Sequence, residues 1–198
     1  MSLPARLLIV TDRHGCPEPL DARVAACLSA GARWIWLRDR DLPAPERAAL
    51  AETLAGLVAG VGGALTIGRD VELAARVGAA GVQLGAAADV AAARARLGQG
   101  ALLGVSAHSL ADVRAAREAG ADYVTLSPIF LTASKPGYGP ALGLAAVREA
   151  AAILPVVALG GIDPKTAPAC RGAGAAAVAV MGAVMRAPEV GGVISALA

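Results

Sequence analysis

The chain has 198 residues and a formal net charge of +2, enough for one domain with a sizeable core. Its basic residues are dispersed, which argues against a nucleic-acid or membrane-surface role. No apolar run is long enough to span a membrane, and the three cysteines lack metal-ligand or redox spacing, so we expect a cytoplasmic protein. Hydrophobic residues make up 56% of the chain but aromatic residues only 3%, which predicts an aliphatic core.

Short apolar runs recur along the whole chain. Their continuous apolar character, without polar alternation, is typical of strands buried on both faces of a parallel sheet. The predicted strands are residues 7–11, 33–37, 64–67, 81–84, 102–106, 122–126, 155–159 and 176–181. The clearest predicted helices between them are residues 45–58, 71–77, 89–97 and 110–119. This alternation predicts a single α/β domain over residues 1–198, a (β/α)8 TIM barrel, with a doubly wound open sheet as the alternative.

An internal repeat favours the barrel. Four times a predicted helix ends in Gly-Ala and leads into a strand, at residues 31–32, 78–79, 120–121 and 174–175. Glycine suits the left-handed conformation that ends a helix, and each interval is long enough for two β/α units. A doubly wound sheet gives no reason for this fourfold regularity.

Glycines follow the last two predicted strands, at the end of the barrel where reactive groups gather. They form two short sites, Gly160 with Gly161 and Met181 with Gly182. Glycine lets backbone N–H groups approach phosphate oxygens, and a helix N-terminus adds partial positive charge. These four residues predict a phosphate cradle, and tight strand-to-helix turns are the alternative explanation.

Two arginines follow the second predicted strand. Arg38 and Arg40 occupy alternate positions, which predicts that both side chains project to one side of the barrel mouth. A pair of guanidinium groups suits an anionic substrate, because each can hold a phosphate through two hydrogen bonds. The alternative is that Asp39 or Asp41 neutralises them in salt bridges.

Polar side chains also end the fourth and fifth predicted strands. Gln83 and Ser106 are candidate substrate-binding residues there, and His108 lies just beyond Ser106. An imidazole transfers protons near neutral pH, so His108 is the candidate acid–base residue. The alternative is a histidine whose ring only bonds a loop carbonyl.

The longest predicted connection, residues 127–143, contains Thr132, Ser134 and Lys135. Long loops in compact barrels often bind ligands, which predicts that these three residues contact substrate. An ordinary exposed excursion is the alternative.

Seven motifs, in their order and spacing, resemble the thiamine-phosphate synthase/TenI family. They are residues 8–12, 37–40, 81–85, 104–108, 121–124, 128–137 and 158–162. The resemblance implies a barrel that binds a phosphorylated thiazole or thiamine phosphate in the cradle. It also implies one of two activities. The synthase joins a pyrimidine pyrophosphate to thiazole phosphate and releases pyrophosphate with Mg²⁺, whereas the TenI tautomerase shifts a proton without a metal.

Departures from the synthase motifs favour the TenI branch. The Mg²⁺-binding Asp that the synthase carries after its third strand matches Arg69 here, and residues 85–88, where a second acid is expected, read Gly-Ala-Ala-Ala. Mg²⁺ usually needs carboxylate ligands, and Asp70 and Asp89 each lie one position too far along the chain. The Arg-x-Arg sequence after the second strand also resembles TenI proteins. Residues 132–135, in contrast, resemble the pyrophosphate-binding loop of the synthase.

The expected function is therefore a metal-independent thiazole tautomerase, an isomerase that uses no cofactor. The resemblance nominates His108 as its acid–base residue. Two alternatives stay open: a divergent thiamine-phosphate synthase in which Arg69 offsets pyrophosphate charge, and a non-catalytic regulator that binds thiazole or thiamine phosphate. A homo-oligomer also stays open, because a predicted C-terminal helix over residues 190–198 packs either on the barrel or against a partner.

Overall fold

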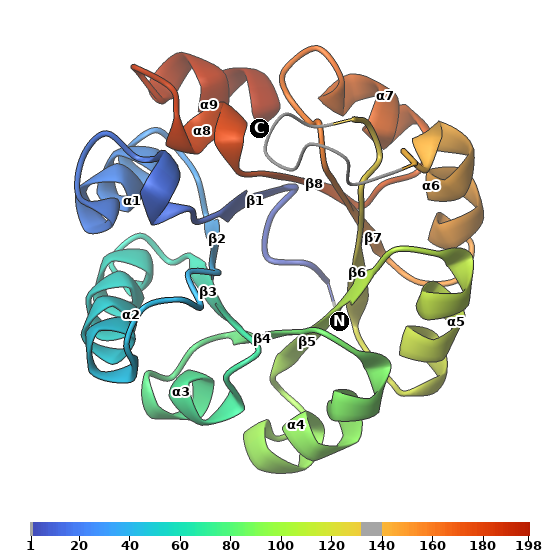
Figure 1. The fold of residues 1–198 in the computed structure, drawn as a ribbon, viewed down its shortest axis with the longest axis horizontal. Helices are drawn as coiled ribbons and strands as arrows, with labels where there is room; N and C mark the ends of the chain where they lie inside the picture. Colours follow the sequence, from blue (N-terminus) through green and yellow to red (C-terminus); the bar gives the residue numbers. More distant parts are fainter. Residues whose placement is uncertain (1, 132–139) are drawn as a thin grey trace.

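The computed structural model describes residues 2–131 and 140–198. Eight parallel strands follow one another around a closed barrel, and β8 pairs with β1 (Figure 1). The strands are β1 Leu7–Val10, β2 Trp34–Leu37, β3 Ala64–Gly68, β4 Gly81–Leu84, β5 Leu102–Ala107, β6 Tyr123–Leu126, β7 Val156–Leu159 and β8 Ala177–Val180. The predicted (β/α)8 barrel is confirmed, and the pairing of β1 with β8 excludes the open sheet.

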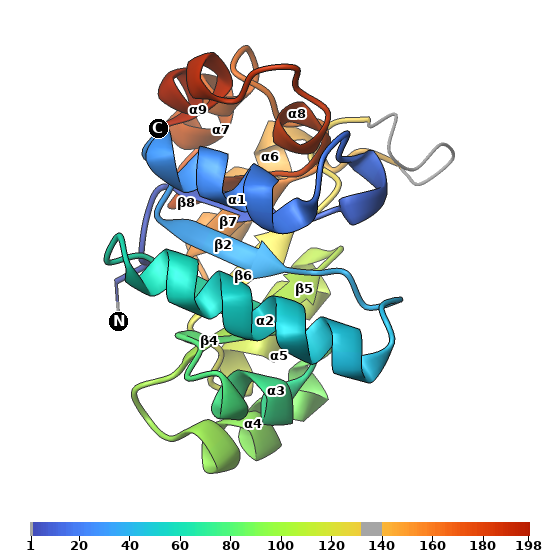
Figure 2. The ribbon, with the colours of Figure 1, turned by 90° about the vertical axis from the view of Figure 1, so that its left-hand side faces the viewer.

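Helices form a ring around the outside of the strands (Figures 1 and 2). They are α1 Leu20–Ser29, α2 Ala44–Ala59, α3 Val71–Arg76, α4 Val90–Leu97, α5 Leu110–Glu118, α6 Gly143–Ala151, α7 Ala167–Gly172, α8 Gly182–Met185 and α9 Gly191–Leu197, with 3-10 turns η1 Arg13–Gly15 and η2 Ala87–Asp89. The C-terminal helix α9 packs on the barrel, where it contacts α1 and α8. Among the described residues, no helix is both long enough and apolar enough to cross a membrane.

The ends of the predicted elements differ from the observed ends by no more than one residue. The four Gly-Ala sites explain part of this agreement. Gly31, Gly78, Gly120 and Gly174 all have positive φ. After each one, the alanine N–H donates to the carbonyl five residues earlier, as Ala32 does to Cys27 at 3.0 Å. Each site is thus a glycine-terminated helix end that leads straight into the next strand.

Aromatic side chains fill the N-terminal half of the barrel interior. This part of the core therefore differs from the aliphatic core that the composition predicts. The Trp34 and Tyr123 rings are 5.2 Å apart between centroids and meet edge to face. Trp34 Nε1 donates to Thr66 Oγ1 at 2.8 Å. Gly104 permits this packing, because a Cβ there would lie 2.2 Å from Tyr123 Cζ. With this end of the barrel filled, a ligand site falls at the C-terminal mouth.

Candidate functional site

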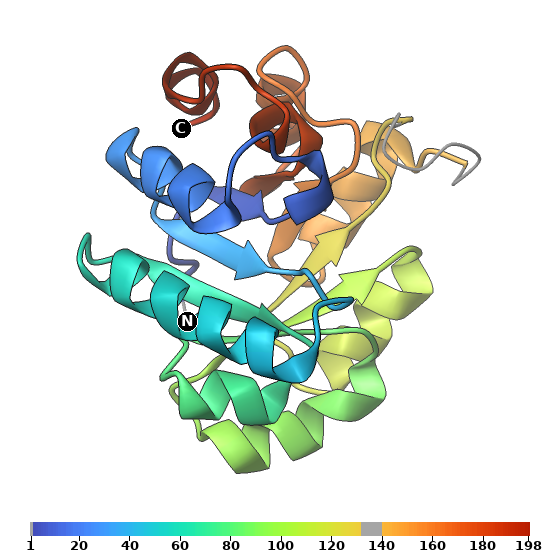
Figure 3. The same cartoon turned by 60° about the vertical axis from the view of Figure 1, so that its left-hand side comes forward.

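A cavity of about 390 Å³ opens at the C-terminal mouth of the barrel. The strand arrowheads in Figure 3 point toward this end. Its walls come from residues at or after the ends of β1, β2, β5, β6, β7 and β8. A volume of this size suits a small heterocyclic ligand that bears a phosphate.

The predicted phosphate cradle forms one wall of this cavity, to which Gly160, Gly161, Met181 and Gly182 all contribute. Gly160 and Gly161 have φ values of +94° and +65°, a left-handed backbone that favours glycine. Within the described part of the chain, the backbone N–H groups of the three glycines donate no hydrogen bond to another backbone group. The structure therefore gathers these donors at one wall, and phosphate binding by them stays a prediction.

Arg38 lines the same cavity, and a buried carboxylate fixes the loop that carries it. The backbone N–H of Arg38 donates to Thr11 Oγ1 at 2.9 Å, and the Thr11 hydroxyl donates to Asp39 Oδ2 at 2.5 Å. Arg13 N–H donates to Asp39 Oδ1 at 2.8 Å. Asp39, only 3% exposed, thereby ties the loop after β2 to the loop after β1.

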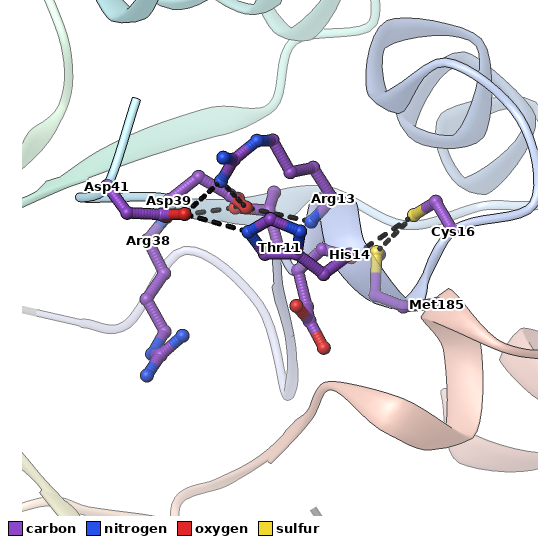
Figure 4. Close-up of polar contacts among 9 residues, drawn as sticks. Thr11, Arg13, His14, Cys16, Arg38, Asp39, Asp41 and Met185 are labelled. Atoms are coloured by element: carbon purple, nitrogen blue, oxygen red, sulfur yellow. Dashed lines mark hydrogen bonds and ion pairs between the residues drawn. The ribbon is translucent and has the colours of Figure 1, made fainter. Parts of the chain in front are cut away.

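Asp41 pairs with Arg13 and His14 rather than with the two arginines after β2. Its Oδ2 lies 2.7 Å from both Arg13 Nη1 and His14 Nε2. These contacts, with His14 the larger contributor, hold the pKa of the Asp41 carboxyl well below its usual value. Figure 4 shows Arg38 extending away from this group of three residues. The alternative in which Asp39 or Asp41 neutralises the arginine pair is not what the structure shows.

Arg40 does not line the cavity that Arg38 enters. It lies in a neighbouring depression together with Arg47, Arg69 and Asp70. The expectation that the two arginines project to one side is therefore corrected. The strand ends at Leu37, so the alternation of a strand no longer governs the residues beyond it.

His108 lines the cavity, and its ring orientation is fixed. Its Nδ1 lies 2.7 Å from the Ser127 carbonyl oxygen. A carbonyl oxygen only accepts, so Nδ1 carries a proton. The backbone N–H of His108 also donates to Asp112 Oδ2 at 2.8 Å. Both the predicted position at the mouth and the alternative bond to a loop carbonyl are observed.

Gln83 and Ser106 do not reach the cavity wall. Gln83 is 1% exposed, and its Nε2 donates to Ser106 Oγ at 3.3 Å and to Thr125 Oγ1 at 3.1 Å. Together they form a polar layer inside the barrel, in which Gln83 and Thr125 are buried and Ser106 is half-buried. The other candidate substrate residues, Thr132, Ser134 and Lys135, lie outside the described residues.

Four polar or aromatic residues of the cavity wall were not predicted as site residues from the sequence: Trp36, Ser127, Asp163 and Arg186. Arg186 comes from the turn after α8, and its Nη2 lies 3.5 Å from Asp12 Oδ2. A usable signal existed for Trp36, since it lies within the second predicted strand near its mouth end. Arg186 reaches the cavity wall because of the way α8 packs on the barrel. Local sequence does not predict that packing.

The residues present do not fit a carboxylate site for Mg²⁺. Asp70 accepts the Leu73 N–H at 2.9 Å as the cap of α3, and pairs with Arg47 at 3.0 Å. Asp89 is exposed at the end of η2. Among the described residues, no group of three acidic, histidine or cysteine side chains could hold a metal, and residues 132–139 contain no acid. The side chain at the expected ligand position is instead the cation Arg69.

A closed (β/α)8 barrel with glycines after β7 and β8 facing a mouth cavity is of the class that holds phosphorylated small molecules there. The family model for thiamine monophosphate synthase matches residues 7–184, so the chain belongs to that family. The putative thiamine-phosphate synthase of Geobacter sulfurreducens is 40% identical over 188 residues, covering 92% of this chain and 88% of that protein.

Two further relatives agree in family. The thiamine biosynthesis bifunctional protein ThiM/ThiE of Symbiobacterium thermophilum is 42% identical over 175 residues, which are 87% of this chain but only 36% of that protein. The solved thiamine phosphate pyrophosphorylase of Pyrococcus furiosus superposes with a TM-score of 0.85 at 29% identity. The match covers 97% of this chain and 93% of that structure.

These names correct the function expected from the sequence. Relatives at about 40% identity are called thiamine-phosphate synthase, so the tautomerase, and with it the isomerase class, is wrong as the first choice. The alternative synthase interpretation is favoured instead. The tautomerase expectation rested on the two missing acidic residues, whose absence does not by itself exclude the synthase reaction.

Proposed function

We propose that this chain is a thiamine-phosphate synthase, a transferase that joins a pyrimidine pyrophosphate to thiazole phosphate. The observation that carries the proposal is the level of identity to proteins of that name, maintained over about nine-tenths of the chain. The mouth cavity supports it, because it combines a glycine wall suited to one phosphate with an arginine suited to a second anionic group.

In this reaction a C–N bond forms between the methylene carbon of the pyrimidine and the ring nitrogen of the thiazole. The C–O bond between that methylene and pyrophosphate breaks, and its electron pair leaves with the pyrophosphate oxygen. Negative charge therefore grows on the leaving group in the transition state. Fixed positive charge near that oxygen accelerates the step, since it stabilises the transition state more than the bound substrates.

The chain's own residues divide between the two substrates in this proposal. Backbone N–H groups of Gly160, Gly161 and Gly182 hold the thiazole phosphate, and Met181 completes that wall. Arg38 faces the pyrophosphate side. His108 contacts the bound substrates with a ring that the Ser127 carbonyl orients, and its proposed role is to position them.

Residues away from the cavity wall have less direct roles. Gln83 and Ser106 support the floor of the site through their mutual hydrogen bond. Thr132, Ser134 and Lys135 remain proposed pyrophosphate contacts on the strength of their motif alone.

The test is a condensation assay of the purified full chain with both substrates, in Mg²⁺ and separately in EDTA. We expect thiamine phosphate and pyrophosphate to appear in equal amounts. The matched control is Gly56→Ala, on the exposed face of α2 with no neighbour within 4 Å of the added carbon, which should keep the wild-type rate. Absence of product in both conditions would overturn the proposal, and saturable substrate binding without product would point to a non-catalytic binder.

A further inference from the structure

Three guanidinium groups beside the barrel mouth have no counter-ion among the described residues. Among the described residues, Arg38, Arg40 and Arg69 make no ion pair and no side-chain hydrogen bond with the protein. Arg47, in the same depression as Arg40 and Arg69, provides the contrast. It pairs with Asp70 at 3.0 Å and donates to the Gly68 carbonyl at 2.8 Å, so its charge is already compensated. Uncompensated cations in one place are unfavourable without an anionic ligand.

The three arginines follow two adjacent strands, with Arg38 on the wall of the mouth cavity and Arg40 and Arg69 in the depression beside it. Leu37 of β2 pairs with Ile67 of β3, so the chain leaves both strands side by side. A Cβ at Gly68 would lie 3.5 Å from Arg38 Cα, and Arg40 lies with Arg69 in one depression. Burial, together with the Arg69, Arg38 and Arg47 charges, lowers the pKa of Arg40, which agrees with this crowding.

Arg69 occupies the space where the family resemblance places the metal ligands. It stands at the position of the first expected acid, and its guanidinium lies against Gly85, the start of the segment that lacks the second. A Cβ at Gly85 would lie 2.6 Å from Arg69 Cζ and Nη2, so this approach requires a glycine. One cation therefore stands at the first of these positions and reaches the start of the segment that lacks the second acid.

The backbone of Arg69 is held in an unfavourable conformation to achieve this. Its φ of 63° makes it the one non-glycine residue with positive φ in the described part of the chain. Such a conformation costs on the order of 1 kcal/mol or more and is typical of functional sites. The Arg69 N–H donates to the Gln83 carbonyl at 2.8 Å, which ties the strained residue to the end of β4.

We propose that Arg40 and Arg69, together with Arg38 on the adjoining wall of the mouth cavity, form a guanidinium site for the pyrophosphate group, which takes over the charge neutralisation that carboxylate-held Mg²⁺ would otherwise provide. This inference rests on the proposed synthase function, because it concerns the leaving group of that reaction. Pyrophosphate bears about three negative charges near neutral pH, and three guanidinium groups offer a comparable positive charge. Each guanidinium can also hold two phosphate oxygens at once.

The first experiment measures binding of inorganic pyrophosphate to the full chain by calorimetry in EDTA. The test variant is Arg69→Asn, because asparagine tolerates the left-handed backbone and keeps the fold. The matched control is Arg114→Gln on the exposed face of α5, which removes the same charge from a residue that lines neither the mouth cavity nor the arginine depression. We expect the wild type and the control to bind equally, and Arg69→Asn to bind about 10- to 100-fold more weakly.

Two results would overturn the guanidinium site. One is wild-type binding that appears only when Mg²⁺ is added, and the other is an Arg69→Asn variant that binds like the wild type. A thermal melt of each variant checks that the fold is retained.

The second experiment repeats the condensation assay in EDTA. A wild-type rate within about threefold of the rate in Mg²⁺, with a loss of about 100-fold in Arg69→Asn, supports the site. A wild-type rate that collapses in EDTA would overturn it. Arg69-dependent pyrophosphate binding with no condensation in any condition would support the site and refute the synthase function, so the two failures are distinguishable.

Discussion

The barrel mouth presents positive potential on two sides, and the two sides achieve it differently. After β7 and β8 the donors are backbone N–H groups, exposed because Gly160 and Gly161 adopt left-handed conformations against the loop at Pro128. After β2 and β3 the positive charge is on the side chains of Arg38, Arg40 and Arg69, which reach out from short loops.

The two sides therefore differ in how they tolerate amino-acid substitutions. Backbone donors are positioned by the path of the chain, so any side chain added at those glycines disturbs both the fold and the site. Side-chain donors are held by their neighbours and can be replaced during evolution without loss of the fold. In this chain, the arginine side is the one that departs from the carboxylate pattern that the family resemblance implies.

The largest expected effect falls on the glycine side. In Gly160→Ala, the new Cβ would lie 2.8 Å from Pro128 Cα at a φ of +94°, so the loop must move. We expect the free energy of unfolding to fall by about 2–4 kcal/mol and condensation to be lost. Urea unfolding and the condensation assay measure both. Gly56→Ala, the control in an unstrained helix, should gain up to about 1 kcal/mol of stability. Equal behaviour of the two variants would contradict the glycine argument.

A smaller effect is expected at the carboxylate that supports the arginine side. Asp39→Ala leaves the Thr11 hydroxyl and the Arg13 N–H without their buried acceptor. We expect the free energy of unfolding to fall by about 1–3 kcal/mol, together with a raised KM for the pyrimidine pyrophosphate as Arg38 loses its support. Steady-state kinetics and urea unfolding test this. An unchanged KM in a destabilised protein would show that Asp39 serves the fold alone.

Substitution of Arg38 itself should affect binding without affecting stability. In Arg38→Lys the charge remains but the fork of two donors is lost, and we expect kcat/KM to fall about tenfold. Arg38→Ala should lose about 10- to 100-fold. Both variants should unfold within about 0.5 kcal/mol of the wild type, since the Arg38 side chain makes no ion pair with any residue that the structure describes. Wild-type kinetics in Arg38→Ala would show that Arg38 does not bind the substrate.

The smallest expected effect is a difference between the two sides in how strongly salt weakens ligand binding. Exposed side-chain charges are screened by added ions, whereas short hydrogen bonds from fixed backbone donors are less sensitive. Raising KCl from about 50 to about 500 mM should weaken pyrophosphate binding about three- to tenfold and inorganic phosphate binding about twofold or less. Calorimetric titrations in both salts measure the ratio. Equal weakening of both ligands would show that the two sides are not distinct.

The sequence by itself determined the barrel, the limits of its strands and helices, and the placement of the glycine wall. Local signals were sufficient for these features. Each strand is a short, mainly apolar run, and each of the four Gly-Ala sites ends a helix through bonds to residues only five positions away. The glycines after β7 and β8 lie side by side because these two strands are neighbours in the closed barrel.

The tertiary structure decided which polar residues meet. Alternation along a strand predicted that Arg38 and Arg40 share a side, but the chain leaves the strand at Leu37 and Asp39 turns inward to Thr11. The contact of Arg69 with Gly85 joins loops from different strands, and depends on a backbone conformation that no local pattern specifies. Contacts between distant segments are set by strand register and side-chain packing, so they exist only once the barrel has closed.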